Sequence, residues 1–331
     1  SVGGYVGGRL LAGGSDVSFV GRARIADRLR QQGITLSRYD GGRWQVPPER
    51  IAVSTDPATA ATADLVLVTV KSAATATAAA ELANVLRPGT VVVSFQNGIG
   101  NAHVLRAALP QCTVLEGMVP FNVVERGPAA FHQGSAGELE IRRAPAMQPF
   151  VDAFNNAGLP LVQHADMVPV QWAKLLLNLN NAINALANRP LKEELSQRAY
   201  RRCLGMAQKE ALALLKRAHI RPARLTPLPA SWIPHVLGVP DAWFERLGRR
   251  MLTIDPLARS SMSDDLAAGR ATEVDWINGE VVRLARRLGQ TAPVNERLGE
   301  LVREAERADV RPSWSGEALL AAVRGAVDAS S

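Results

Sequence analysis

Cysteine and histidine are scarce in this sequence, which has two cysteines and five histidines in 331 residues. Cys112 and Cys203 lie far apart without a CxxC pair, and the histidines show no spacing typical of a metal site. No apolar run reaches the roughly 18 residues that span a membrane, and no cleavable signal pattern is present. These absences argue against a disulfide-stapled secreted domain, a metalloprotein and a membrane protein. We therefore expect a reduced, cytoplasmic protein without a metal ion.

The charge of the chain leaves one further class open. Lys and Arg number 38 against 31 Asp and Glu, so the net charge is +7. Such an excess can serve nucleic-acid binding, but the basic residues are spread along the sequence and mostly flank expected helices. The length and the 47% hydrophobic content fit an ordinary globular protein of two domains. We therefore favour an anionic small-molecule cofactor over nucleic acid as the partner of any local positive charge.

Apolar strands alternate with helices in the first half of the chain. The strand segments are runs of Val and Leu without polar alternation, which is typical of strands buried on both faces of a parallel sheet. The pattern predicts an α/β, Rossmann-type doubly wound sheet, with an irregular edge near residue 45 and an antiparallel end at 127–143. The expected strands cover residues 15–22, 50–56, 63–72, 89–100 and 112–122, and the expected helices cover 74–86 and 101–109.

Long amphipathic helices replace the strands after about residue 164. A loop rich in Pro and Trp, residues 221–243, interrupts them. The sequence therefore predicts a sheet domain at 1–164 and an all-α domain at 165–331. The expected helices cover 167–187, 193–218, 259–288 and 294–308.

The opening stretch, SVGGYVGGRLLAGG, combines a helical pattern with six glycines. Each Gly inside a helix costs roughly 1 kcal/mol relative to Ala, so a close backbone approach is indicated. The stretch fits the end of a G-x-G-x-x-G motif, in which Gly3 packs the helix against the sheet beside a pyrophosphate. We then expect one strand and a turn, with the first two glycines, to precede residue 1. A glycine-rich helix interface without a cofactor explains the stretch equally well.

Polar residues stand at the carboxyl ends of three expected strands, where open α/β sheets hold ligands. Arg22 lies 19 residues after Gly3, just past a strand, with Arg24 close by. An acidic residue there would bind the ribose of NAD, whereas arginine accommodates the 2′-phosphate of NADP. Lys71 and Asn97 end two further strands. Together they predict an NADP site, while each alone is also typical of a solvated loop or turn.

A lysine and two asparagines share one face of the helix expected at 167–187. At about 100° per residue, Asn178 lies about 40° from Lys174 and Asn181 about 20° on its other side. A polar stripe on an otherwise apolar helix requires partners, because an unpaired buried charge is costly. We interpret Lys174 as a proton donor facing substrate in a cleft between domains; pairing with a carboxylate is the structural alternative. Glu273 begins a later helix, where a carboxylate serves as a cap as readily as in a site.

Together these residues resemble the ketopantoate reductases, or 2-dehydropantoate 2-reductases. The matching segments follow the order of that family over nearly the whole chain: SVGGYVGGRLLAGG, LVTVKS, SFQNGIG, WAKLLLNLNNAINAL, RSSMSDDLAAGRATEVDWINGEVV and APVN. The resemblance implies a helical domain like that of 6-phosphogluconate dehydrogenase. It also implies reduction of 2-dehydropantoate to pantoate by NADPH, a step toward pantothenate and coenzyme A.

The resemblance further implies a role for each residue of the helical domain's site. Lys174 would be the general acid, and Glu273 would lie beside the lysine and the substrate hydroxyl. Asn178, Asn181 and Ser261 would bind substrate, with Ser261 near its carboxylate.

In the sheet domain, the resemblance places Gly3 and Lys71 at the cofactor and Arg22 at its 2′-phosphate. Asn97 would contact the cofactor and help to order the complex with substrate. The partner is then a small 2-oxo acid, without nucleic acid or membrane, and a homodimer stays open.

The chain departs from the family pattern in three places. The first two glycines of the dinucleotide motif are absent from this sequence. The second helix asparagine of the family would fall at Ala182, so either Asn181 or Asn184 would take its role or the substrate contact would differ. The segment 221–243 is also longer and less regular than expected. These departures leave two alternatives open: a reductase of another 2-oxo acid, and an NADP-binding sensor without catalytic activity.

Overall fold

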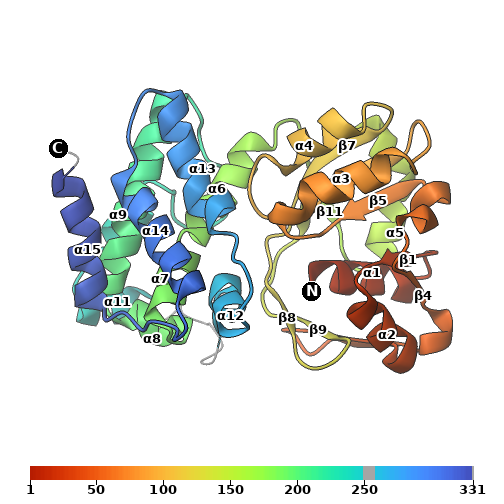
Figure 1. Cartoon of the computed structure of the whole chain (residues 1–331), viewed down its shortest axis with the longest axis horizontal. Helices are drawn as coiled ribbons and strands as arrows, with labels where there is room; N and C mark the ends of the chain where they lie inside the picture. Colours follow the sequence, from red (N-terminus) through yellow and green to blue (C-terminus); the bar gives the residue numbers. More distant parts are fainter. Residues whose placement is uncertain (249–257, 330–331) are drawn as a thin grey trace. The chain divides into compact units, whose positions relative to one another are not determined.

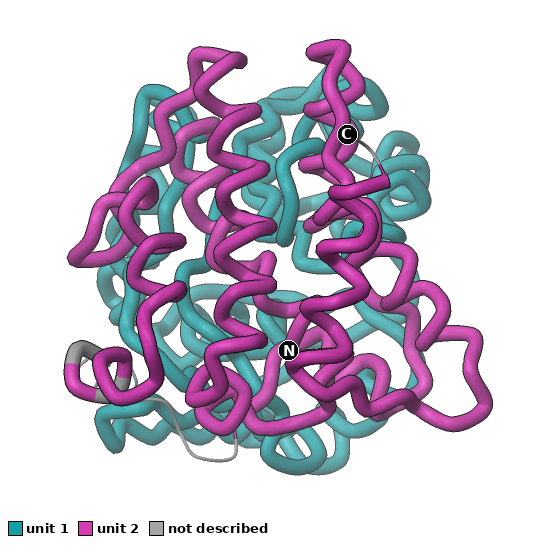
Figure 2. Tube along the Cα trace, turned by 90° about the vertical axis from the view of Figure 1, so that its left-hand side faces the viewer, with its two compact units in different colours: residues 1–167 teal, residues 168–331 magenta. Residues whose placement is uncertain are grey.

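The computed structural model describes residues 1–248 and 258–329 of the chain. The chain forms two compact units, residues 1–167 and 168–331, which Figure 2 colours separately. Residues 249–257 and 330–331 of the expected helical domain lie outside the described residues. Among the helices that are described, none is long and apolar enough to cross a membrane.

The predicted strands of unit 1 form, and parallel pairing dominates as expected, but the strands divide between separate sheets (Figure 1). The largest sheet has the order β11-β10-β7-β6-β5. In it β5 (Leu65–Val68), β6 (Val91–Ser94) and β7 (Thr113–Met118) are parallel neighbours. β10 (Leu139–Arg142) is antiparallel to β7, and β11 (Leu161–His164) is parallel to β10. β1 (Ser18–Val20) and β4 (Ala52–Ser54) form a separate parallel pair.

A four-stranded sheet with the order β3-β2-β9-β8 was only partly expected. β3 (Arg43–Val46) is the edge predicted near residue 45, but β2 (Ile34–Arg38) and β8 (Val123–Glu125) were missed. The prediction of an antiparallel end of the parallel sheet at 127–143 is right for β10 only, because β9 (Ala130–Gln133) belongs to the four-stranded sheet, where it is parallel to β2 and antiparallel to β8. In β2, Ile34 and Leu36 are buried and Thr35 is exposed. This alternation is typical of a sheet with one solvated face, not of the continuous apolar runs used to find the other strands.

Helices cover both faces of the parallel strands in unit 1. Val91 and Val93 of β6 belong to a core with Tyr5 and Val6, whereas Val92 belongs to a second core with Leu105. The strand is therefore buried on both faces, as its sequence predicted. The helices of the unit are α1 (Val2–Ala12), α2 (Ala23–Gln32), α3 (Thr75–Ala83), α4 (Asn101–Ala108) and α5 (Val151–Asn156).

The described residues of unit 2 contain helices and loops but no strand. Its helices are α6 (Val168–Asn178), α7 (Asn180–Ala187), α8 (Leu191–Ser196), α9 (Arg198–Arg217), α10 (Ile233–Leu237), α11 (Asp241–Gly248), α12 (Ser261–Ala267), α13 (Val274–Arg287), α14 (Pro293–Arg307) and α15 (Gly316–Ala329). The helix expected at 294–308 matches α14 closely, whereas α15 was missed. The segment 221–243, expected as loop, contains α10 and the start of α11.

Three of the expected helices are each two helices in the structure. The helix expected at 167–187 divides at Leu179, and the one expected at 193–218 divides at Gln197, which has extended backbone (φ −97°, ψ 121°). The helix expected at 259–288 ends at Ala267, because Gly269 takes a left-handed φ of +60° in the following turn. These interruptions lie between residues that share an apolar pattern, so periodicity did not reveal them.

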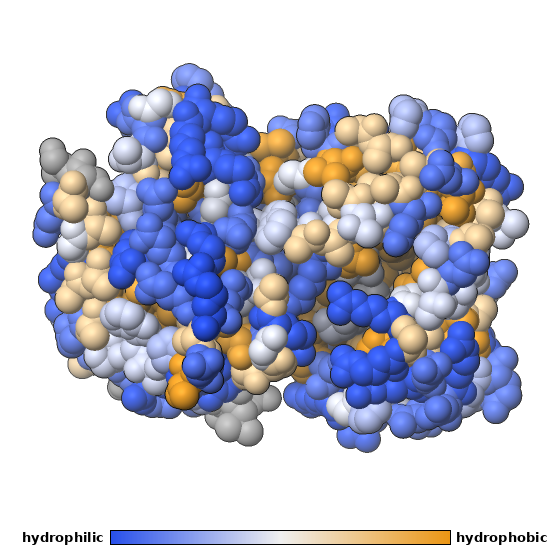
Figure 3. Space-filling view, viewed as in Figure 1, coloured by the Kyte–Doolittle hydropathy of each residue, from blue (hydrophilic) through white to orange (hydrophobic). Residues whose placement is uncertain are grey.

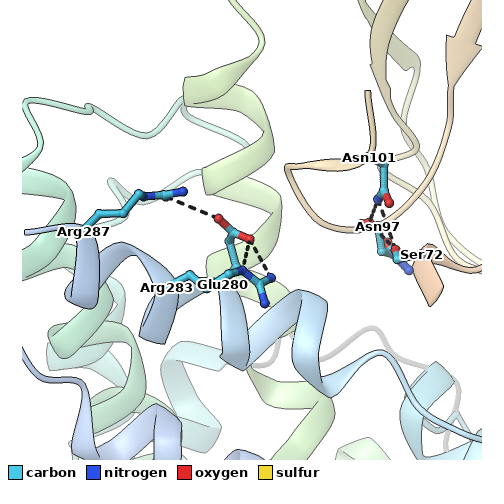
Figure 4. A network of polar contacts seen from close by, with 6 residues as sticks. All are labelled: Ser72, Asn97, Asn101, Glu280, Arg283 and Arg287. Carbon is cyan, nitrogen blue, oxygen red and sulfur yellow. Dashed lines mark hydrogen bonds and ion pairs between the residues drawn. The ribbon is translucent and has the colours of Figure 1, made fainter. Parts of the chain in front are cut away.

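Hydrophilic side chains cover much of the surface over α13 and α14 (Figure 3). Glu280 lies between two arginines, 2.7 Å from Arg283 and 3.4 Å from Arg287 (Figure 4). Arg286 pairs with Glu296 and Arg303 with Asp275 in the same region. The arginines of this surface are thus matched by carboxylates, as expected for arginines that flank solvated helices.

Candidate functional site

Glycines bring α1 into close contact with two strands of unit 1. A Cβ atom at Gly3 would lie 2.4 Å from the Oγ1 of Thr69, which directly follows β5. A Cβ atom at Gly7 would lie 2.5 Å from the ring of Phe19 in β1. The first turn of α1 carries no acidic residue. A helix start that approaches a strand end this closely, without negative charge, fits a bound anionic group such as a pyrophosphate.

Lys71 and Asn97 lie on neighbouring loops, because β5 and β6 are adjacent and parallel. The Ser72 hydroxyl donates a hydrogen bond to the backbone oxygen of Asn97 at 2.8 Å. The Asn101 amide donates to that same oxygen at 2.6 Å and to the Ser72 hydroxyl at 3.1 Å (Figure 4). These bonds fix the two loops to each other, and so they fix the backbone positions of Lys71 and Asn97.

A second set of buried polar residues supports these loops. The sequence analysis did not identify these residues. The Gln96 amide donates to the Thr75 hydroxyl at 2.7 Å and to the backbone oxygen of Val70 at 2.9 Å. Thr75 in turn donates to Asn101 Oδ1 at 2.8 Å, and the Ser94 hydroxyl donates to Gln96 Oε1 at 2.9 Å. These residues could have been suspected from the sequence, because Ser94 is a polar residue at the end of an apolar strand and Thr75 and Asn101 are polar residues at the starts of α3 and α4.

Arg22 stands two residues beyond β1, where it is the residue that precedes α2. Its side chain is exposed, and so is that of Arg24. Both guanidinium groups therefore face solvent at the carboxyl end of a parallel strand, which is the position predicted for recognition of a 2′-phosphate.

Lys174 projects from α6 between buried neighbours. Trp172, Ala173 and Leu175 are all buried, whereas the Lys174 side chain keeps intermediate exposure. Desolvation by the surrounding protein nevertheless lowers the pKa of Lys174 to about 8. The amine is therefore mostly protonated at neutral pH and releases its proton more easily than an ordinary lysine, as a general acid requires.

The four asparagines around Leu179 divide into two pairs. Asn178 and Asn181 are half-buried, whereas Asn180 and Asn184 are buried. Both ends of the Asn184 amide are used inside the unit, since its oxygen accepts from the Ser260 backbone and its nitrogen donates to Glu194. Of the two residues expected to replace the family's second asparagine, Asn181 is therefore the better placed for a substrate.

Glu273 and Ser261 each stand at the start of a helix. Glu273 directly precedes α13, but its carboxylate makes no capping hydrogen bond; the Thr272 hydroxyl accepts from the Val274 backbone instead. Ser261 is the exposed first residue of α12, whose cap is the Ser260 hydroxyl. The capping role that sequence left open for Glu273 is thus filled by another residue.

The described residues contain no group of three or more His, Cys, Asp or Glu side chains that could hold a metal ion. Unit 1 instead has polar residues in the loops at the carboxyl ends of parallel strands, and unit 2 has a lysine desolvated by its surroundings. A sheet unit of this kind, followed by a helical unit, fits a nicotinamide-dependent oxidoreductase.

Comparison with known proteins places the chain within this class. The family models described as "Ketopantoate reductase PanE/ApbA" and "Ketopantoate reductase PanE/ApbA C terminal" match residues 1–146 and 166–306. The chain belongs to the ketopantoate reductase family.

Relatives and solved structures cover nearly the whole chain. A 2-dehydropantoate 2-reductase of Halobacterium salinarum is 31% identical over 322 residues, with 93% of this chain and 96% of the relative covered. The crystal structure of a PanE/ApbA family ketopantoate reductase from Ralstonia eutropha JMP134 has a TM-score of 0.78 at 28% identity, covering 92% of this chain and 95% of that one. A ternary structure of D-mandelate dehydrogenase with NADH and anilino(oxo)acetate shares the fold, with a TM-score of 0.75 at 17% identity and coverage of 91% and 94%.

Proposed function

We propose that this protein reduces 2-dehydropantoate to pantoate with NADPH, and so supplies pantoate for pantothenate and coenzyme A. The observation that carries the proposal is Lys174, a desolvated lysine whose pKa is lowered to about 8; Asn178 lies one turn further along α6, and the half-buried Asn181 follows near the start of α7. The substrate is taken from the Halobacterium salinarum relative, whose name is 2-dehydropantoate 2-reductase.

Unit 1 binds the cofactor in this proposal. The start of α1 at Gly3 receives the pyrophosphate, and Lys71 and Asn97 contact the cofactor from the loops after β5 and β6. Arg22 binds the 2′-phosphate, which makes NADPH the preferred cofactor over NADH. The bound cofactor supplies the hydride for C2 of the substrate.

Unit 2 supplies the proton and most of the contacts to the substrate. The Lys174 ammonium group donates a hydrogen bond to the C2 carbonyl oxygen, polarises it, and gives it a proton as the alcohol forms. Glu273 accepts a hydrogen bond from a substrate hydroxyl and lies beside the lysine. Asn178 and Asn181 bind the polar groups of the substrate, and Ser261 binds its carboxylate.

One observation favours a second substrate, another 2-oxo acid of similar size. Ala182 stands where the family has its second helix asparagine, and Asn184 is bound inside the unit. A site with one amide fewer near this turn would accept an acid that lacks the single hydroxyl group of 2-dehydropantoate.

Oxidation of NADPH, followed by absorbance, tests both versions. We expect turnover with 2-dehydropantoate and a much lower kcat/KM with NADH. Turnover restricted to other 2-oxo acids would replace the substrate and keep the reaction. NADPH binding without turnover of any 2-oxo acid would contradict the enzymatic function.

A further inference from the structure

Residues 258–260, which lead into α12, are hydrogen-bonded to α7, to Asn188 at its end and to the first residue of α8. The Ser260 backbone N–H donates to Asn184 Oδ1 at 2.9 Å, and the Ser260 hydroxyl donates to the backbone oxygen of Asn181 at 3.2 Å. Just before Ser260, the Leu191 N–H donates to the Ala258 oxygen at 2.8 Å, and Arg259 donates to Asn188 Oδ1 at 3.2 Å. The start of α12 therefore takes its position from α7.

Asn184 is the centre of this contact, and its orientation is determined by its partners. Its side chain is fully buried. The amide nitrogen donates to the Arg189 backbone oxygen at 3.0 Å and to Glu194 Oε2 at 3.1 Å, while the oxygen accepts from Ser260. A flipped amide would direct its NH₂ group at the N–H of Ser260 and its oxygen at two acceptors. Only one orientation satisfies all three groups.

Glu194 holds Asn184 in place from α8. Its carboxyl group is fully buried and accepts from both Asn180 and Asn184 through Oε2. Oε1 has no hydrogen-bond partner among the described residues. A buried carboxyl group with an unsatisfied oxygen lowers stability relative to an apolar side chain of similar size. The Glu194 carboxyl group instead gives the Asn180 and Asn184 amides a hydrogen-bond acceptor at a fixed position.

The segment 258–260 is followed by Ser261, a residue of the proposed substrate site. Ser261 follows Ser260 directly, and its side chain is exposed. Asn181, the other proposed substrate ligand, is the residue whose backbone oxygen binds the Ser260 hydroxyl. The same turn of α7 thus carries one ligand and holds the residue next to the other.

We propose that Asn184, held by Glu194, is a positioning residue that fixes the Ser261 hydroxyl relative to Asn181 for binding of the substrate carboxylate. The inference rests on the proposed function for the identity of the substrate. Asn184 does not touch the substrate and acts through the backbone of Ser260.

Four variants test the proposal by steady-state kinetics and by hydrogen exchange of a peptide covering residues 258–267. Asn184→Ala and Glu194→Leu should raise the KM for 2-dehydropantoate roughly tenfold, the effect of one lost hydrogen bond in a site, with kcat and NADPH affinity near wild type. Both should speed exchange in the peptide. Glu194→Gln keeps an oxygen acceptor for the two asparagines and should retain the wild-type KM. Asn278→Ala is the control, because Asn278 is equally buried but donates to Asn295 instead.

The two measurements separate the outcomes. Exchange that rises no more in Asn184→Ala than in Asn278→Ala would overturn the proposal, whatever the activity. Faster exchange with an unchanged KM would also overturn it, because α12 would then be held without consequence for substrate. If Asn184→Ala does not fold, the contrast of Glu194→Leu with Glu194→Gln decides. A wild-type protein that does not reduce 2-dehydropantoate would contradict the proposed function, and exchange alone would then decide whether Asn184 holds α12.

Discussion

The two units place their candidate residues by different means. In unit 1, Lys71 and Asn97 follow β5 and β6, whose register pairs Val68 with Ser94, so the sheet itself brings the two loops together. In unit 2, Lys174 and Ser261 come from separate helices, and buried side chains such as Asn184 and Glu194 hold the segments in place. A strand-end site therefore follows from sheet topology, whereas a site on helices depends on individual polar groups in the core.

Replacing Lys174 should have the largest effect and tests unit 2. Lys174→Ala should lower kcat roughly 10²–10⁴-fold, because it removes the proposed general acid, while the Kd of NADPH stays near wild type. Stopped-flow reduction and cofactor fluorescence measure the two quantities. Lys192→Ala, an exposed lysine of α8, is the control and should retain activity.

The pH profile of the wild-type enzyme gives a second check on Lys174. Its pKa of about 8 means that the protonated form prevails below that value, so kcat/KM for reduction should fall as pH rises through about 8. A full rate at pH 9.5, or an active Lys174→Ala variant, would remove the lysine from the mechanism and leave unit 2 without a proton donor.

Replacing Arg22 tests unit 1. A charge-assisted hydrogen bond contributes about 1.5–3 kcal/mol, so Arg22→Ala should weaken NADPH binding roughly 10- to 100-fold and change NADH binding little. Arg30→Ala, at the other end of α2, serves as the control. Titration of cofactor fluorescence measures each Kd. Equal losses for both cofactors would show that Arg22 does not read the phosphate.

The difference between the two units also explains which features could be predicted from the sequence. Arg22, Lys71 and Asn97 were predicted as site residues because each is a polar residue that follows an apolar strand, and the structure has each of them just beyond a strand. Lys174 was predicted because a charged residue interrupts an apolar stripe. Both signals are local, and the fold class follows from the same strand and helix patterns.

The missed features depend on contacts between distant segments. Asn184 reads like its neighbours Asn178 and Asn181, and only its contacts with Glu194 and Ser260 show that it faces the interior. The same limit hid the break at Gly269, because an apolar pattern continues across a turn. The four-stranded sheet was only partly predicted, because its strand β2 alternates polar and apolar residues over only five positions.

Replacing Glu194 should change the pH dependence of stability. Burial raises its pKa from 4.5 to about 8, so the folded state binds more protons than the unfolded state between these values, and its stability falls as pH rises through that window. Glutamine does not titrate, so the stability of Glu194→Gln relative to wild type should rise by up to about 1.4 kcal/mol per pH unit. Urea unfolding between pH 5 and pH 8 measures this difference, and parallel curves would contradict the buried acid.

A pair of helical glycines gives the smallest expected effect and tests whether unit 1 depends on packing as well as topology. Gly3→Ala puts a Cβ atom 2.4 Å from Thr69 Oγ1, and overpacking of this kind costs about 1–3 kcal/mol. Gly325→Ala in α15 meets no atom within 4 Å and should stabilise the protein by up to about 1 kcal/mol, the difference in helix propensity. Chemical denaturation measures both changes. If Gly3→Ala were as harmless as Gly325→Ala, the close approach of α1 to β5 would be wrong. The glycine at the start of α1 would then not be required by packing against the residue that follows β5.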